Sequence, residues 1–224
     1  MKGYFTKAET LLWSCSVVLI ISSFFIFGNS GYLSLVASLV SVTSLIFCAK
    51  GNPTGQALMI VFSLLYGYIS LTFRYYGEMI TYVGMSLPMA VLSLVEWLRH
   101  PYGDSKSEVQ VNKPTRRDYT VMWILTALVT LIFYFILKFF NTANLIPSTF
   151  SVTTSFLAVF LTFKRSPLYA LAYATNDVVL IVLWVLAAFR DSSYISVVVC
   201  FIAFLVNDLY GFYNWKRMEK RQRS

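Results

Sequence analysis

The sequence predicts an all-α integral membrane protein with eight transmembrane helices, and three observations support this fold class. Of its 224 residues 58% are hydrophobic and 12% are charged, whereas a soluble domain uses about a quarter of its residues for charge. The apolar residues form continuous runs of about 20, the length that a helix needs to cross a bilayer core. These runs do not alternate apolar and polar residues as the strands of a membrane barrel do. Helices are therefore expected, because they satisfy their own backbone hydrogen bonds in lipid.

Eight apolar runs qualify as membrane spans. The first follows Lys2 and Lys7 and could be mistaken for a secretory signal peptide. It contains Trp13 and is not followed by a small-residue cleavage site, so we expect it to be retained as a helix. The eight runs lie at 11–27, 31–50, 55–74, 78–98, 118–140, 147–163, 167–189 and 193–215.

The basic residues between the runs predict the orientation of the chain. If the amino terminus is cytoplasmic, only Arg74, Lys138 and Arg190 of the 18 lysines and arginines fall on the outer side. Membrane proteins place such an excess of positive charge on the cytoplasmic side. Both termini are therefore expected in the cytoplasm. The net charge of +8 follows from this topology, so no nucleic-acid partner is expected.

A polar stretch at 99–117 divides the chain near its middle. It contains Pro101, Gly103 and Pro114 and has no apolar periodicity, so it is expected to be a cytoplasmic loop. The resulting division is an N-terminal transmembrane helix at 1–30, a first triple-helix bundle at 31–98, the loop and a linker helix at 99–146, a second triple-helix bundle at 147–216 and a basic cytoplasmic tail at 217–224.

The two triplets of helices have similar residues at their helix boundaries. Pro53 and Pro167 each follow a basic turn and open the middle run. Trp97 and Trp215 close each triplet just before basic residues, as expected of anchors at the cytoplasmic interface. Both middle runs lead from inside to outside, so the triplets are parallel and the run at 118–140 is the linker of a 3+1+3 plan. Parallel repeats place a substrate cavity between them, around an axis along the membrane normal.

Polar side chains inside the second triplet are expected to line this cavity, because lipid offers them no partner. Those of the run at 167–189 share one side of a helix, and those at the end of the last run follow the spacing i, i+3, i+7. The alternative is a structural cluster that ties helices together, and anchoring at the interface competes evenly for Asn214. The candidate substrate-binding residues here are Tyr173, Asn176, Asp177, Trp184, Asn207, Tyr210 and Asn214.

The first triplet carries a second polar stripe. Gln56 is its strongest candidate for substrate binding, because a primary amide offers two donors and an acceptor. Tyr66 lies on the same stripe, together with Ser63 and Ser70. Pro88 is expected to kink the last helix of this triplet. The outer gate or rim is expected to contain Arg74, Glu78 and Tyr82.

The sequence predicts no catalytic residues, no metal site and no cofactor. A membrane enzyme would need a nucleophile with its base, a carboxylate pair or a metal cluster. His100 is the single histidine, and Cys15, Cys48 and Cys200 are scattered through apolar runs. A phosphorylated nucleotide is a poor substrate candidate, since no basic cluster lies within the membrane. A structural subunit whose polar stripes bind partner helices is the third alternative.

The Asn176-Asp177 pair with its aliphatic run to Trp184, the closing motif YGFYNW from Tyr210, and the 3+1+3 plan resemble the PnuC family of nicotinamide riboside transporters over residues 31–216. The resemblance implies a SWEET-like vitamin transporter of a bacterial inner membrane, often a homotrimer. It further implies facilitated diffusion of nicotinamide riboside for NAD biosynthesis, with a cytoplasmic riboside kinase that traps the product.

One segment departs from the family pattern. Where family members often carry a W-x-x-W pair before the position of Asn176, this chain has Tyr169 and Tyr173. Tyrosines can replace tryptophans as stacking surfaces, but thiamine and riboflavin stay open as alternative substrates. In the leading hypothesis the pyridinium ring lies near Tyr173, Trp184 and Tyr210, while amide and ribose groups bind Gln56, Asn176 and Asn207.

Overall fold

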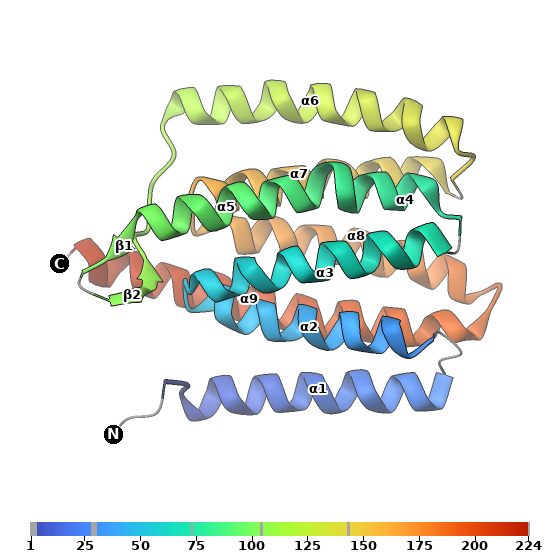
Figure 1. The fold of residues 1–224 in the computed structure, drawn as a ribbon, viewed down its shortest axis with the longest axis horizontal. Coiled ribbons are helices and arrows are strands. Elements are labelled where there is room, and N and C mark those ends of the chain that lie inside the picture. Colours follow the sequence, from blue (N-terminus) through green and yellow to red (C-terminus); the bar gives the residue numbers. More distant parts are fainter. Residues whose placement is uncertain (1–3, 28–30, 73, 104, 143, 224) are drawn as a thin grey trace.

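The structure is a computed structural model that describes residues 4–27, 31–72, 74–103, 105–142 and 144–223. Within these residues eight helical segments are long and apolar enough to cross a membrane. They run side by side in one bundle (Figure 1). The predicted all-α fold with eight spans is therefore confirmed.

The fourth span is made of three consecutive helical pieces, and a short hairpin follows it. The elements are α1 (Lys7–Phe27), α2 (Tyr32–Ala49), α3 (Pro53–Thr72), α4 (Tyr76–Ile80), η1 (Thr81–Ser86), α5 (Leu87–Arg99), β1 (Pro101–Tyr102), β2 (Ser105–Val109), α6 (Arg116–Phe139), α7 (Leu145–Phe163), α8 (Leu168–Ala188), η2 (Ser192–Tyr194) and α9 (Ile195–Arg223).

The two ends of the bundle differ. The start of α1, the end of α9 and the β1–β2 hairpin lie together at one end (Figure 1), which we name the hairpin end. The α3–α4, α6–α7 and α8–α9 connections lie at the other end, which we name the mouth end. Helix α1 therefore begins and α9 ends on the same side of the bundle, which agrees with the predicted orientation.

The irregular fourth span follows from its proline. Pro88 has no N–H group and cannot continue the i to i−4 hydrogen-bond ladder. The preceding turn, Thr81–Ser86, is a π-helix, in which the Leu87 N–H donates to the carbonyl of Tyr82. A π-helical turn beside a proline is a recognised cause of helix distortion. Its place agrees with the irregularity predicted at Pro88.

The turns that open the two middle helices have the same geometry. Gly51 (φ 66°) and Arg165 (φ 54°) both adopt the left-handed conformation. Their N–H groups donate to Cys48 and Thr162 across 2.9 and 3.0 Å. These paired bonds close α2 and α7 with the αL cap that commonly ends helices. The parallel repeat stays a prediction, and these matched turns favour it.

The loop between the two triplets contains more structure than its sequence predicted. Its β1–β2 strands form an antiparallel hairpin. Residues 109–112 then connect the two halves at the hairpin end, and we name this segment the strap. The Val109 N–H donates to the Gly51 carbonyl, and the Asn112 N–H donates to the Arg165 carbonyl, both across 2.9 Å. The strap therefore joins the matched turns of both triplets.

Helices α1 and α6 lie at opposite edges of the bundle (Figure 1). α6 packs chiefly on α7, and α1 packs on α9 and α2. Much of their remaining surface is apolar and exposed, including Phe25, Ile26, Trp123 and Ile124. Such surfaces are the expected contacts with lipid chains, whereas the polar side chains of the other helices face inward.

Candidate functional site

A cavity lies between the two triplets. Its walls come from α2, α3 and α5 on one side and from α7, α8 and α9 on the other, with additions from α1, α4 and η1. About 200 Å³ of it is open to the centres of water molecules, whereas one water needs only about 10–15 Å³ by this measure. The space is therefore large enough for a ligand or for a cluster of waters.

Most of the predicted site residues meet at this cavity. The first triplet contributes Gln56 and Tyr66 together with the predicted rim residues Glu78 and Tyr82. The second triplet contributes the face of α8 that its spacing predicted. The residues of that face are Tyr173, Asn176, Asp177 and Trp184.

Asn176 is held in one orientation by α7. Its amide oxygen accepts hydrogen bonds from the hydroxyls of Thr154, at 2.7 Å, and Ser155, at 3.1 Å. Its nitrogen makes no hydrogen bond to any other described side chain. The amide group therefore keeps two donors for a molecule in the cavity. Thr154 and Ser155 are consecutive residues of a Ser/Thr-rich run in α7, which the sequence analysis did not consider.

Aromatic rings form the wall of the first triplet. Tyr66 packs against both Phe62 and Tyr82, with ring centroids 4.9 and 5.0 Å away. On the opposite side Trp184 lies beside Tyr194, at 5.2 Å. Flat ligands stack on such rings, and a cation over a ring face gains about 0.5–2 kcal/mol.

The charge of the cavity is entirely acidic. The charged residues among its described lining are Glu78, Asp177 and Asp208, with no lysine, arginine or histidine. Asp177 and Asp208 are 4% and 5% exposed. Their carboxyl groups, from α8 and α9, are neighbours in the cavity. A carboxyl group at membrane depth is costly unless it has a partner, and usually marks a binding site or a wet cavity.

The cavity adjoins a second space at the mouth end. The two share Glu78, Leu183 and Trp184 among their walls, and the second is also lined by Arg74 and Arg190. Arg74, predicted as a rim residue, is thus in the outer space and not in the cavity. The cavity therefore opens toward the mouth end.

At the hairpin end the bundle is sealed by three aromatic side chains. Trp97 and Trp215 are fully buried and Tyr169 is 3% exposed. The Trp215 ring centroid lies 5.4 Å from that of Trp97 and 4.9 Å from that of Tyr169. We name these three residues the aromatic seal.

The two tryptophans of the aromatic seal bind across the triplets in a reciprocal way. The Trp97 indole N–H donates to the Thr162 carbonyl at 3.0 Å, and the Trp215 indole N–H donates to the Cys48 carbonyl at 2.8 Å. Each triplet therefore caps the first helix of the other. The sequence suggested interfacial anchoring for these tryptophans, but the structure buries them in the bundle.

Three predicted residues of α9 lie outside the cavity. Asn207 donates to the Ser16 hydroxyl on α1 at 2.9 Å, Tyr210 donates to Glu9 at 2.9 Å, and Asn214 donates to the Ala49 carbonyl at 2.8 Å. The i, i+3, i+7 face is real, but it packs against α1 and the end of α2. The face that reaches the cavity is the adjacent one, which carries Phe204 and Asp208. The placement of these three residues in the cavity is therefore corrected.

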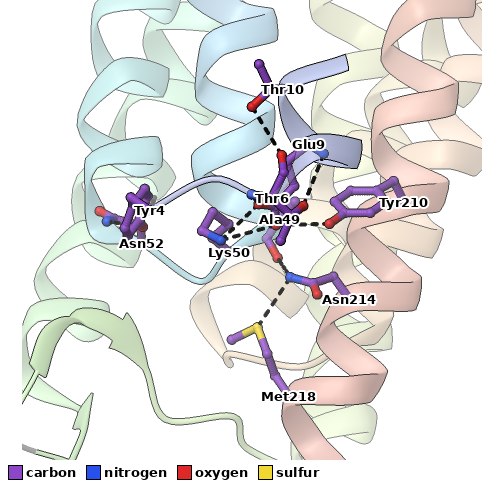
Figure 2. A network of polar contacts seen from close by, with 10 residues as sticks. All are labelled: Tyr4, Thr6, Glu9, Thr10, Ala49, Lys50, Asn52, Tyr210, Asn214 and Met218. Carbon is purple, nitrogen blue, oxygen red and sulfur yellow. Dashed lines mark hydrogen bonds and ion pairs between the residues drawn. The ribbon is translucent and has the colours of Figure 1, made fainter. Parts of the chain in front are cut away.

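Figure 2 shows the contacts that hold part of this face. Glu9 accepts from the Lys50 ammonium at 3.1 Å, from the Thr6 N–H at 2.7 Å and from Tyr210. Asn214 lies next to this group, beside Ala49 and Met218. These side chains attach the start of α1 to α2 and α9, and this is a structural role.

The residue that the sequence reasoning missed is Asp208. It follows Asn207 directly, and an acidic side chain in the middle of an apolar run is by itself a signal for a site. Ser63, noted only as part of a stripe, is 1% exposed and lines the cavity. Its hydroxyl has no hydrogen-bond partner among the described residues.

These features define a class of protein: a polytopic helical membrane protein with a cavity between two triplets, lined by aromatic, amide and acidic side chains, open toward one end and sealed at the other. Comparison with known proteins gives the family. The family model described as nicotinamide mononucleotide transporter matches residues 31–217. The chain therefore belongs to this transporter family, and the resemblance to PnuC proteins is confirmed.

Individual relatives agree. The chain is 24% identical over 201 residues to the nicotinamide riboside transporter PnuC of Neisseria mucosa, covering 88% of this chain and 76% of that one. It is 22% identical over 191 residues to the protein of the same name from Haemophilus influenzae, covering 85% and 81%. A crystal structure of the vitamin B3 transporter PnuC shares the fold, with a TM-score of 0.82 and 22% identity over 98% of this chain and 95% of the other.

Proposed function

We propose that the protein is a facilitator that carries nicotinamide riboside across a bacterial inner membrane. Membership of the transporter family supports transport, and the names of two relatives support this riboside. The observation that carries the proposal is the chemistry of the cavity. Amide donors, tyrosine rings and carboxyl groups meet there without a basic side chain among the described lining.

Nicotinamide riboside fits this chemistry in each of its parts. Its pyridinium ring is flat and positively charged, which suits tyrosine faces and carboxyl groups. Its carboxamide and ribose hydroxyls suit Gln56 and Asn176, since each amide side chain offers donors and an acceptor. The phosphate of the mononucleotide would need arginine or lysine partners, and the described lining has none. The cavity therefore favours the nucleoside over the nucleotide.

Calorimetric titration of the purified protein tests this substrate. We expect binding of nicotinamide riboside and much weaker binding of nicotinamide mononucleotide and riboflavin. Thiamine is the most instructive competitor, because it is also a cationic heteroaromatic molecule. Binding of thiamine without binding of nicotinamide riboside would reassign the substrate within the same fold.

A matched pair of substitutions separates transport from a purely structural role. Asn176→Leu removes a cavity amide, and Asn207→Leu removes an amide that binds α1 instead. We expect Asn176→Leu to abolish uptake of labelled nicotinamide riboside at normal expression, while Asn207→Leu lowers thermal stability and keeps uptake. Loss of assembly without a specific loss of uptake in Asn176→Leu would favour the structural-subunit alternative.

The remaining parts of the proposal concern the cell. The hairpin end faces the cytoplasm, because it carries most of the lysines and arginines. A cytoplasmic riboside kinase consumes the imported product, and the protein works as a homotrimer, as the family resemblance implies. Labelling of a cysteine introduced at Lys220 only after permeabilisation tests the orientation. Accumulation with and without kinase, and the mass of the detergent-solubilised assembly, test the other two.

A further inference from the structure

Two acidic side chains meet in the depth of the cavity. Asp177 on α8 and Asp208 on α9 both line it and are each at least nine-tenths buried. The two carboxyl groups are neighbours, one on each helix. Two like charges so close cannot both persist, so the pair holds at most one negative charge, which a cationic ligand would stabilise.

The charge of this pair is not balanced by a described side chain of the cavity. The other charged residue of the described lining is Glu78, which is also acidic. One oxygen of Asp177, Oδ2, has no hydrogen-bond partner among the described residues. From the other triplet Ser63, likewise a lining residue, brings a second buried oxygen without a partner in the described part of the chain. Buried polar atoms are rarely left unpaired in native proteins, so these atoms indicate a place for a ligand.

An aromatic surface lies beside the pair. Tyr173 precedes Asp177 by one helical turn on the same face of α8 and also lines the cavity. It lies close to both Asp177 and Asp208. A ring and a carboxylate side by side form a site that attracts a flat organic cation twice, through its charge and through its face.

We propose that Asp177 and Asp208 form a receptor for a single positive charge, which selects a cationic heteroaromatic ring over a neutral ring of the same shape. This inference rests on the proposed function, since it assigns the pyridinium of the riboside to this pair. Asp208 is then a specificity-determining residue, although it was not among the candidate residues that the sequence predicted.

Two forms of one ligand test the selection. Nicotinamide riboside is a cation, whereas its 1,4-dihydro form has the same ribose and carboxamide and is neutral. For the wild-type protein we expect a dissociation constant about tenfold or more lower for the cation. Equal binding of the two forms, or tighter binding of the neutral form, would overturn the inference without any variant.

A double substitution then locates the effect. Asp177→Asn together with Asp208→Asn removes the negative charge, and should weaken binding of the cation about thirtyfold and leave binding of the neutral form nearly unchanged. Each single variant keeps one carboxylate beside an amide of similar shape and should keep the preference for the cation. Persisting binding of the neutral form also shows that the double variant is folded. The control is Glu108→Gln, which removes one carboxylate from the hairpin outside the bundle and should change neither constant. Equal weakening of both forms, or of neither, contradicts charge selection.

The substrate proposal and this inference can fail separately. If the wild-type protein binds thiamine but not nicotinamide riboside, and the variant with Asn at both positions loses thiamine, the substrate is wrong and the charge receptor is right. If the protein binds nicotinamide riboside equally well with Asn at both positions, the substrate is right and the receptor is wrong. If it binds riboflavin and neither cation, both are wrong.

Discussion

Removing the indole hydrogen bonds of the aromatic seal should open the hairpin end more often. Trp97→Phe and Trp215→Phe each delete one bond between the triplets, of 3.0 and 2.8 Å. The acceptors are not left unpaired, because the Thr162 and Cys48 carbonyls also accept from the N–H groups of Arg165 and Gly51. The expected loss is therefore that of one net hydrogen bond, about 1 kcal/mol.

This magnitude converts directly into a population. A change of about 1 kcal/mol shifts an opening equilibrium about fivefold. Replacement of the larger indole by a phenyl ring also leaves a small void, which adds to the effect. The two effects should not simply add in the double variant, since the rings lie 5.4 Å apart and contacting residues couple.

Cys48 provides the assay. It lies at the aromatic seal, is 4% exposed and is absent from the described cavity lining. In a Cys15→Ser, Cys200→Ser background, labelling of Cys48 by a maleimide in detergent reports opening, because modification is slow compared with reclosing. We expect each tryptophan variant to be labelled about five times faster than its parent.

The matched control is Trp123→Phe, the same substitution at a position that is 59% exposed on the apolar surface of α6. It should be labelled at the parental rate. Parental labelling rates in both Trp97→Phe and Trp215→Phe would refute the assignment of these residues to a closing contact. Acceleration in Trp123→Phe would show that the assay reports general loosening.

Three further predictions concern packing and the attachment of α1. Gly55→Ala should destabilise the protein by about 1–3 kcal/mol, because the added methyl group would lie 2.5 Å from Cys48 Sγ and 2.7 Å from the Cys48 nitrogen. A thermal melt measures this loss. The control is Gly84→Ala, whose added methyl group would have its nearest contact at 3.5 Å. Glu9→Gln breaks the ion pair with Lys50 and should cost about 1–2 kcal/mol, seen as a lower melting temperature, while an unchanged melt would contradict the structural role of this contact. Tyr210→Phe should lower the melting temperature less and leave the affinity for nicotinamide riboside unchanged, and a large loss of affinity would return this residue to the binding site.

The sequence was sufficient for the fold because the bilayer imposes it. Continuous apolar runs have one stable solution in lipid, and the length of each run sets the span. The same reasoning did not predict the β1–β2 hairpin. Its strands are short and polar, and Val109 of β2 is held by hydrogen bonds with Gly51 and Gln222, which are distant in sequence.

The site was only partly predictable, for a reason that α8 and α9 illustrate. On α8 the polar face is also the cavity face, so spacing placed Asn176 and Asp177 correctly beside the cavity. On α9 polar residues occupy two faces, because α1 and α2 bind one of them. Periodicity identifies a face but not its neighbour, and it therefore favoured Asn207 over Asp208.

The strap at 109–112 has a consequence for how the halves can move. Its backbone is hydrogen-bonded to Gly51 in one half and to Arg165 in the other, so a four-residue segment sets the distance between these two turns. A wide separation of the halves at this end would break those hydrogen bonds. Opening of the aromatic seal is therefore expected to leave this tether in place and to proceed as a rotation of one half about it.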